Sequence, residues 1–564
     1  MKTNSYRVGL LGVVLLLATA LPGRVHGQAN RWINTADDQW EIGANWSAGV
    51  PNGTQSIFIT NGVNSKTITV NNATVLSNAL NSCMTVSNLI ISAPSSFQNT
   101  LSLTNAGTST EFVVRGTLTV SPRGSLTITN SILRVGVSGL GATTWTVDGT
   151  TTLNSGTIVS FASCGLFCFV VRPTVIGSTS TGVFTVAGGR WVSAPVQLGS
   201  SLSSYGTLTI AGGSVTMSAG LSGPIYALDV VNGTVWLLGG ALQTSSSVSI
   251  GDAGGNGQMI VSNGTWTTST APSIGASGGS GTLTIAGGTA APNQIYVGVG
   301  AGSRGAIWET GGQFTPGDLQ VGLDNAGQMT ISNGTFLAGT IYVGVNANSA
   351  GTFTMAGGTG SVDGWLYVSA LGCSTTGIVN IVGGSLNVTN SAHTAFLELD
   401  GGTLTMSGGT LRADKIVVTN CAHFVQTGGT LICTNFMLDA TNDADSDGVP
   451  NGADAVPFNP NNDSDGDGLS NLQEYLAGTS PTNSASVLRI TSIATEGINI
   501  RVTWMTGPGK TNALQRTAGA AGSFSNNFAA IFTVTNTVGT ITNYLDLGAA
   551  TNGPAFYYRV RLVP

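Results

Sequence analysis

The chain has 564 residues, of which 8% are charged and 81 are glycine, and its formal net charge is −6. Such a sparsely charged, mildly acidic chain has no basic patch for nucleic acid or anionic lipid, so those two classes of partner are excluded. A chain of this length rarely folds around a single core, and its glycine content directs attention to internal repeats.

Residues 1–27 have the features of a signal peptide. A basic start with Lys2 and Arg7 precedes an apolar run from Val8 to Leu21, and small residues precede Gln28, where cleavage is expected. The apolar run is about 14 residues long, which is too short to span a bilayer comfortably. We therefore expect an exported protein, extracellular or on the outer cell surface, with no transmembrane segment in the mature chain.

Six cysteines follow the predicted signal peptide, and an even number in an exported protein permits disulfide bonds. Fifteen pairings are open, and buried free thiols are an equally good interpretation, so no pair is assigned. Metal binding through cysteine is disfavoured because no Cys-X-X-Cys spacing occurs. The cysteines are Cys83, Cys164, Cys168, Cys373, Cys421 and Cys433.

Residues 28–110 are expected to form an N-terminal cap with the first β-strands, and residues 111–438 a series of β-solenoid repeats. Pairs of Gly-Gly or Asn-Gly mark the repeats, and their second glycines are 20 to 31 residues apart, most often 24. Asn occurs only at the first position of a pair, which suggests that this position is left-handed. The second glycines are Gly189, Gly213, Gly233, Gly264, Gly288, Gly312, Gly334, Gly358, Gly384, Gly409 and Gly429.

Each repeat carries two short strands of alternating apolar and polar residues, as in GTLTIAGG at 206–213. Units of about 24 residues without a helical pattern cannot bury an apolar face alone, so they are predicted to stack as an all-β, parallel β-helix. Large apolar residues usually stand two positions after the second glycine, which predicts an internal ladder containing Trp266, Phe314 and Phe336. Hairpins in a sandwich or propeller are the alternative, but a propeller blade needs about 40 residues.

Three aspartates of the solenoid are weighed as catalytic groups. Asp318, Asp363 and Asp414 follow their glycine pairs by five or six residues, which predicts separations of two rungs, or ~9.6 Å. That is the upper limit for the carboxylates of an inverting glycosidase. No Arg or His is expected to join them apart from Arg412, with Lys415 also beside Asp414, so solvated loop acids are the favoured interpretation.

A row of residues on four successive rungs is predicted to point outward, because each follows an inward aliphatic residue. Such a row either stabilises neighbouring rungs, which is the favoured reading, or binds the apolar faces of sugar rings. The row consists of Tyr296, Gln320, Tyr342 and Tyr367.

Residues 439–483 are strongly acidic: nine of the 25 acidic residues lie between Asp439 and Glu474, and no Lys or Arg occurs from Ile416 to Leu488. Carboxylates this close repel one another unless a divalent cation joins them. Two loops follow calcium-loop spacing, with carboxylates at positions 1, 3, 5 and 12 and glycine at 6. The expected ligands are Asp443, Asp445, Asp447, Asn451 and Asp454 in the first loop, and Asp463, Asp465, Asp467, Leu469, Asn471 and Glu474 in the second.

Calcium is therefore the expected cofactor. The second loop should bind it more strongly, because Glu474 can supply two oxygens whereas the shorter Asp454 reaches less far. Pro457 and Pro460 forbid a helix between the loops. The sequence DSDGDGLSNLQEYLAGTSPTN at 463–483 resembles bacterial thrombospondin type 3 repeats, and this resemblance implies a nearly helix-free strap organised by calcium.

Residues 486–564 are predicted to form a separate β-sandwich of the immunoglobulin or fibronectin III kind. The segments LRITSIA, INIRVTWM, ALQRT, IFTVT and FYYRVRLV alternate between apolar and polar residues and are separated by turn residues. Trp504 is expected in the core of this domain.

The GTLTIAGG-like units, with the opening segment WINTADDQWEIGANWSAGVP, resemble bacterial autotransporter-associated β-strand repeat proteins over residues ~30–435. The chain departs from autotransporters because no C-terminal set of amphipathic membrane strands follows, so another export route is implied.

We expect a secreted or cell-surface structural, adhesive protein without enzymatic activity. Its expected partners are calcium ions and, as a candidate, extracellular polysaccharide or a cell surface. A carbohydrate-active β-helix enzyme, a polysaccharide lyase or glycoside hydrolase, is the alternative. The scarcity of titratable groups on the repeats argues against it.

Overall fold

The computed structural model describes residues 27–136, 143–160, 173–218, 226–419, 421–535, 537–551 and 555–563. Nearly all of the predicted signal peptide, residues 1–26, lies outside the described residues, as do Cys164 and Cys168. In the described part of the chain, no helix is both long and apolar enough to cross a bilayer.

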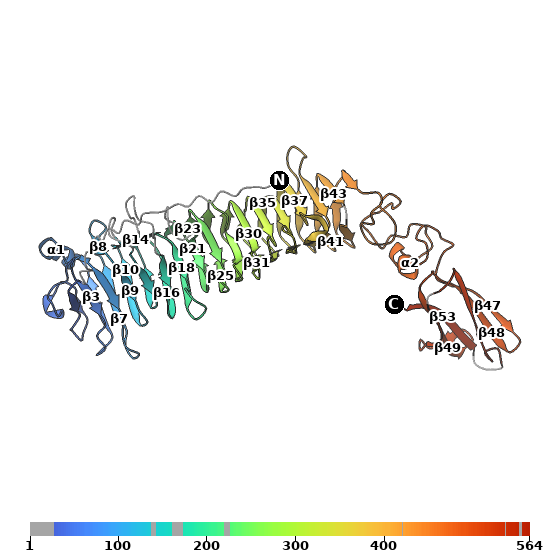
Figure 1. Cartoon of the computed structure of the whole chain (residues 1–564), viewed down its shortest axis with the longest axis horizontal. Coiled ribbons are helices and arrows are strands. Elements are labelled where there is room, and N and C mark those ends of the chain that lie inside the picture. Colours follow the sequence, from blue (N-terminus) through green and yellow to red (C-terminus); the bar gives the residue numbers. More distant parts are fainter. Residues whose placement is uncertain are drawn as a thin grey trace, which may run out of the picture.

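Short parallel strands stack along one axis into a β-solenoid, which confirms the predicted fold class (Figure 1). Strands lie in three columns, here called the first, second and third faces. The first face is a 16-stranded sheet, and the other two are joined as one 30-stranded sheet because β35 and β37 are long enough to belong to both. Parallel pairing begins at the first strand, so residues 28–110 belong to the same stack.

The first face contains β2 (Asp38–Gln39), β4 (Lys66–Val70), β7 (Asn99–Thr104), β10 (Gly124–Thr129), β13 (Thr150–Leu153), β16 (Thr181–Val186), β19 (Tyr205–Ile210), β22 (Gly233–Leu237), β25 (Asn256–Val261), β28 (Ser280–Ile285), β31 (Arg304–Glu309), β34 (Ala326–Ile331), β36 (Ala350–Met355), β38 (Thr376–Ile381), β41 (Thr403–Met406) and β44 (His423–Gln426). The second face contains β5 (Thr85–Val86), β8 (Glu111–Val114), β11 (Ser131–Val135), β14 (Gly156–Ser160), β17 (Arg190–Ser193), β20 (Ser214–Met217), β23 (Ala241–Thr244), β26 (Thr265–Thr268), β29 (Thr289–Pro292), β32 (Gln313–Phe314), β35 (Thr335–Val343), β37 (Thr359–Val368), β39 (Ser385–Val388), β42 (Thr410–Ala413) and β45 (Thr430–Ile432).

The third face contains β1 (Ala29–Arg31), β3 (Ser56–Ile59), β6 (Asn88–Ile91), β9 (Leu118–Val120), β12 (Trp145–Val147), β15 (Thr174–Ile176), β18 (Val196–Leu198), β21 (Tyr226–Val230), β24 (Ser247–Ile250), β27 (Ser273–Ala276), β30 (Gln294–Val299), β33 (Asp318–Val321), the ends of β35 and β37, β40 (Phe396–Asp400), β43 (Lys415–Thr419) and β46 (Phe436–Leu438). Short 3-10 turns occur at η1 (Gly43–Asn45) and η2 (Gly372–Ser374).

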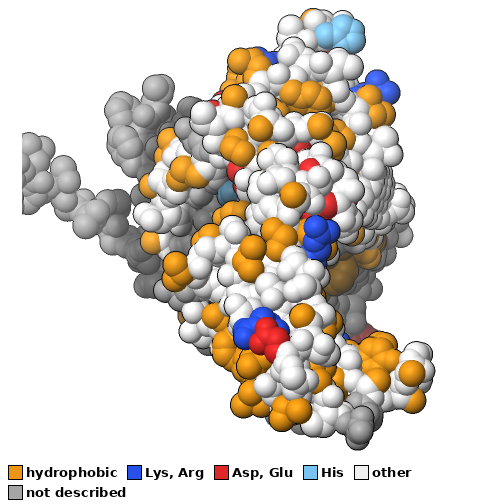
Figure 2. Space-filling model, turned by 90° about the vertical axis from the view of Figure 1, so that its right-hand side faces the viewer, with side chains coloured by type: hydrophobic (Ala, Val, Ile, Leu, Met, Phe, Trp, Pro, Cys, Tyr) orange, Lys and Arg blue, Asp and Glu red, His pale blue; other side chains and the backbone are white. Residues whose placement is uncertain are grey.

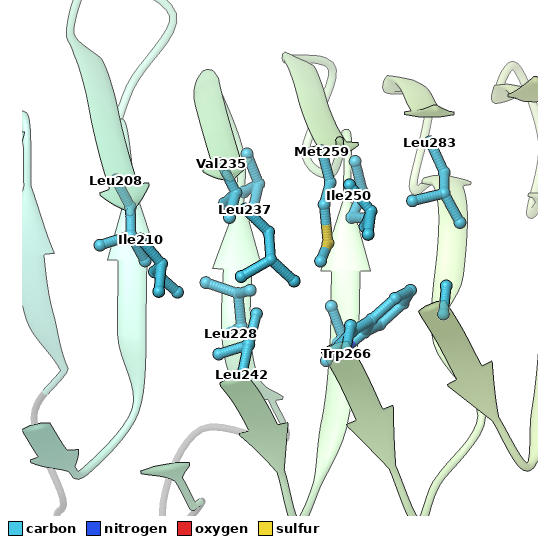
Figure 3. Packing of buried hydrophobic residues seen from close by; sticks show 14 of the residues in the cluster. Leu208, Ile210, Leu228, Val235, Leu237, Leu242, Ile250, Met259, Trp266 and Leu283 are labelled. Atoms are coloured by element: carbon cyan, nitrogen blue, oxygen red, sulfur yellow. The ribbon is translucent and has the colours of Figure 1, made fainter. Parts of the chain in front are cut away.

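The solenoid core is built from ladders of equivalent inward residues. Leu208, Val235, Met259 and Leu283 pair in register on successive rungs of the first face, and all are fully buried (Figure 3). Threonines alternate with them and point outward, as the period of two requires. Because each turn contributes only a few apolar side chains, the core is continuous along the rod rather than concentrated at one centre.

The predicted second-face ladder is confirmed for its aromatic members. Trp266 pairs through Ala290 with Phe314, and Phe314 with Phe336, and all four are buried inside the solenoid. Val235, which the rule of two positions after the second glycine also assigns to this ladder through Gly233, does not belong to it, because Val235 lies on the first face. The corresponding ladder residue is Leu242, which pairs with Trp266.

The pair at 232–233 does not mark a repeat turn. It leads into β22, whereas the repeat turn of this rung is made by Gly239 and Gly240. Gly240 is left-handed, with φ of 69°, like the second glycine of the other pairs. Counting Gly240 in place of Gly233 makes the repeat more regular.

In every pair except 232–233 the left-handed residue is the second one, which corrects the expectation that it was the first. Gly213 has φ of 70°, and a Cβ atom there would lie 2.3 Å from the Gly189 carbonyl oxygen of the preceding rung. Asn263 and Asn333, at first positions, have no positive φ. Glycine is therefore required at the second position both for its dihedral and for the close approach of stacked turns.

One helix interrupts the first turns and was not predicted. Helix α1 (Asn72–Asn81) begins at Asn71, whose side chain accepts a hydrogen bond from the Ala73 N–H at 2.8 Å. Beside it the end of the solenoid is closed by tryptophans: Trp40 and Trp46 pack edge to face with ring centroids 4.8 Å apart.

The C-terminal domain is an antiparallel β-sandwich of seven strands, as expected. One sheet contains β47 (Ile490–Glu496), β48 (Asn499–Met505) and β52 (Ile541–Asp546); the other contains β49 (Thr511–Ala520), β50 (Ser523–Phe524), β51 (Ala529–Val534) and β53 (Ala555–Val563). Trp504 is fully buried between the sheets with Val502 and Leu514, which confirms its predicted place.

Among the cysteines, Cys373 and Cys421 form a disulfide bond with their Cα atoms 6.1 Å apart. Cys83 and Cys433 are free. The bond joins two turns near the C-terminal end of the solenoid across a sequence separation of 48 residues.

Candidate metal centre

The acidic segment joins the last solenoid turns to the C-terminal sandwich and contacts both (Figure 1). Phe458 stacks on Phe424 of β44 with ring centroids 4.4 Å apart, and the Phe424 N–H donates to the Ala444 carbonyl at 2.8 Å. Toward the sandwich, the Tyr475 ring lies 5.9 Å from the Lys510 ammonium. The segment is therefore a packed junction that also covers the end of the solenoid core.

Two loops, 20 residues apart, have the same internal hydrogen bonds. In the first, the Gly448 N–H donates to Asp443 and the Val449 N–H donates to Asp447, both at 2.8 Å. The equivalent bonds of the second loop are both 2.9 Å. The glycine at position 6 is left-handed in each, with φ of 92° and 94°. The predicted loop spacing thus produces one conformation twice.

Each loop brings its first three carboxylates together. One oxygen of each residue lies within 4.8 Å of the others of its triplet. No Lys or Arg is present in the segment to balance this charge. The triplets are Asp443, Asp445 and Asp447, and Asp463, Asp465 and Asp467.

The second loop is completed by Glu474. Its side chain is 0% exposed, and neither carboxylate oxygen has a hydrogen-bond partner. Burial first, and then repulsion from the three aspartates of the loop, raises the pKa of Glu474 to about 7. A buried carboxylate that faces three others with both oxygens free is stable as an anion only beside a cation.

The first loop is more deeply buried and is completed by Asp454. Asp445 is 4% exposed and one of its oxygens has no partner. Burial, followed by repulsion from Asp447, Asp454 and Asp443, raises the pKa of Asp445 to about 8. One oxygen of Asp454 accepts the Val456 N–H at 2.8 Å, which leaves the other for a ligand.

The asparagines at position 9 brace the loops. Asn451 accepts the Ala444 N–H at 3.0 Å, and Asn471 accepts the Ser464 N–H at the same distance. Asn471 also donates to Asp447 of the first loop at 2.7 Å, so the two loops are coupled. The loop bond from the Leu469 N–H holds that residue at position 7.

The segment contains more helix than the resemblance implies. Helix α2 (Asn471–Ala477) begins at position 9 of the second loop, with Ser470 and Gln473 forming a capping box at its start. Glu474 is thereby held on the first turn of a helix. The tract between the loops, which contains Pro457 and Pro460, has no helix.

The donor set of both loops fits a hard divalent cation. All the candidate side-chain ligands are oxygens, and calcium takes six to eight oxygens at about 2.3–2.6 Å, some from backbone carbonyls and water. The unpartnered oxygens of Glu474, Asp445, Asp454, Asp465 and Asp467 are the donors that the loops themselves leave unused. Residues 443–454 and 463–474 would hold one ion each.

The three solenoid aspartates do not form one column. Asp318 is in register with Thr340, and Thr340 is in register with Trp365. The position that corresponds to Asp318 on β37 is therefore Trp365, and Asp363 lies two residues before it. Asp414 accepts the Asn390 N–H at 3.0 Å and lies 3.2 Å from His393 Nδ1.

The expectation that no histidine joins these acids is therefore wrong for Asp414. A reversal of the chain at Asn390 brings His393 across to Asp414, which linear spacing does not show. The His393 side chain is highly exposed, and the backbone of this residue is left-handed, with φ of 55°. This contact braces a turn, and the hydrogen bonds around it involve Asn390 and Thr394 rather than a nucleophile–base pair.

The predicted outward row lies on the third face and is larger than expected. Tyr342 and Tyr367 stack with centroids 5.1 Å apart and planes 8° from parallel. Trp365 and Phe396, which are not part of the predicted row, pack against Tyr367 with ring centroids 5.8 and 5.6 Å apart. Alternation in GWLYV would have revealed Trp365, because it stands two residues before Tyr367 on the same strand.

Comparisons of this chain with protein-family models, with curated proteins and with solved structures find no match.

Proposed function

We propose that the protein is an exported adhesive rod whose junction with the C-terminal sandwich is locked by two calcium ions. The observation that carries the proposal is the buried Glu474 carboxylate, which has no partner and faces the second aspartate triplet. The similar clustering of three aspartates in the first loop supports a second ion. The resemblance to thrombospondin type 3 repeats points in the same direction.

Calcium would stiffen the junction by a direct route. Without a cation, nine carboxylates in one short segment repel one another, and the loops tend to open. With calcium, Asp447 and Asn471 are fixed together, and Tyr475 is held against the backbone of Gly448. The same helix reaches Lys510 of the sandwich, so ion binding couples the solenoid end to the terminal domain.

A structural role is also supported by the scarcity of charge along the solenoid. Only 8% of the chain is charged, and nine of its 25 acidic residues lie in the acidic segment rather than in the solenoid. Figure 2, which looks at the C-terminal end of the molecule, shows only scattered charged side chains on that side. General acid–base catalysis needs converging titratable groups. The register of Asp318 and the bracing role of Asp414 favour scaffolding over such chemistry.

Calorimetric titration of the full chain with calcium tests the proposal. We expect two ions per chain, loss of one in Glu474→Gln, and no change in Asp363→Asn, which neutralises an exposed acid of the solenoid. Limited proteolysis should cut the 439–483 segment faster in chelator than in calcium. The absence of binding heat, or equal cleavage with and without calcium, would refute the proposed junction.

A further inference from the structure

An aromatic surface occupies the outward side of the third face over six rungs, from β30 to β43. Two outward columns run along it in parallel register. We call this surface the aromatic platform. One column contains Gln294, Asp318, Thr340, Trp365, Phe396 and Lys415, and the other contains Tyr296, Gln320, Tyr342, Tyr367, Glu398 and Val417.

The centre of the platform is apolar and its two ends are polar. Trp365 is 42% exposed although its ring contacts Tyr367 and Phe396. On one side the amide of Gln294 donates to Asp318 at 3.1 Å. This arrangement, rings at the centre and hydrogen-bonding groups at the border, suits a ligand with an apolar surface and polar edges.

The charge of the border selects among such ligands. Asp318 and Glu398 lie in the two columns and Asp400 lies beside them, against one cation, Lys415. Anionic chains such as polyuronates, nucleic acids or acidic lipid surfaces would be repelled. Neutral sugar hydroxyls, in contrast, can donate to these carboxylates.

The dimensions of the platform also suit a sugar chain. Neighbouring rungs are ~4.8 Å apart, close to the length of one extended pyranose residue, so successive sugars would meet equivalent positions. The strands of the platform are already paired on both sides. A strand of a protein partner would therefore find no free edge there to extend.

We propose that the aromatic platform binds a neutral polysaccharide chain laid along the solenoid axis, with Trp365, Tyr367 and Tyr342 stacking on sugar rings. This inference rests on the proposed adhesive function and names the class of ligand. Binding here would be distributed over several rungs, so the affinity should rise with the length of the sugar chain.

Affinity electrophoresis of the full chain in calcium tests the inference. Gels would contain xylan, mixed-linkage β-glucan or galactomannan, with polygalacturonate as the anionic counterpart. We expect at least one neutral glycan to slow migration and polygalacturonate to have no effect. Trp365→Ala and Tyr342→Ala should each weaken binding about tenfold or more.

Trp308→Ala is the matched control, because Trp308 is 38% exposed but lies on the first face. It should bind like the wild type. No retardation by any of the three neutral glycans, equal retardation by polygalacturonate, or equal loss in Trp308→Ala would overturn the inference. Calcium titration of the same variants distinguishes the proposed calcium junction from the proposed glycan site. If the protein binds calcium but no glycan, only the proposal of glycan binding at the platform is refuted.

Discussion

Glu309 predicts an unusual dependence of stability on pH. It ends β31 with its side chain inside the solenoid, 0% exposed, in register between Ile285 and Ile331. Neither of its oxygens has a hydrogen-bond partner, although the N–H groups of Phe314 and Thr335 lie near enough to favour the anion. Burial outweighs them and raises the pKa of Glu309 from 4.5 to about 8.

The folded state prefers the protonated acid, so the cost of burying Glu309 is smallest below pH 4.5 and grows as pH rises toward 8. With about 1.4 kcal/mol per pKa unit, the cost is about 3 kcal/mol at pH 7 and approaches about 5 kcal/mol above pH 8. Between pH 5 and pH 8.5 this one group should remove about 4 kcal/mol.

Denaturant unfolding at pH 5 and pH 8.5, in saturating calcium, measures this cost. In Glu309→Gln, most of the difference in the free energy of unfolding between pH 5 and pH 8.5 should disappear. Glu309→Ile, which places an isoleucine between Ile285 and Ile331, should be more stable than the wild type at pH 8.5. Asp363→Asn is the control because that acid is exposed. If the wild type and Glu309→Gln lose equal stability between the two pH values, the carboxylate is not buried as described.

Two further outcomes follow from the packing of the solenoid. Phe336→Asp should lower the free energy of unfolding by several kcal/mol, because a charge would enter a dry ladder without a partner, whereas Thr354→Asp on the outward side of β36 should change it little. Equal losses in thermal unfolding would contradict the inward–outward assignment. Replacing Cys373 and Cys421 together by serine should lower the free energy of unfolding by up to about 4 kcal/mol, because the bond that closes a 48-residue loop in the unfolded chain is lost. Equal denaturation midpoints with and without the bond would contradict this.

The repeat could be predicted because two independent signals coincide in it. Alternation in strands such as β19 fixes which side chains face inward, and the left-handed second glycine marks where each turn closes. A false marker arises where a similar pair has another conformation. Gly233 begins a strand with no positive φ, and only its neighbours in the stack distinguish it from Gly240.

Features that depend on contacts between rungs could not be predicted in the same way. Trp365 and Phe396 are separated by 31 residues, and their contact exists because β37 and β40 pair in register. His393 reaches Asp414 for a similar reason, through the turn at Asn390. Such contacts depend on the varying length of the turns, which alternation within a strand does not encode.

The two acidic loops, residues 443–454 and 463–474, show both situations in one segment. Their spacing is local, so the sequence identifies the carboxylates of each loop, and the structure arranges both loops alike. Their function as a junction depends instead on three long-range contacts: Phe458 on Phe424, Asn471 on Asp447, and Tyr475 near Lys510. These contacts place the two acidic loops between the solenoid and the sandwich. Under the proposed function, calcium bound there would neutralise the repulsion in one short segment and so control the stiffness of the whole rod.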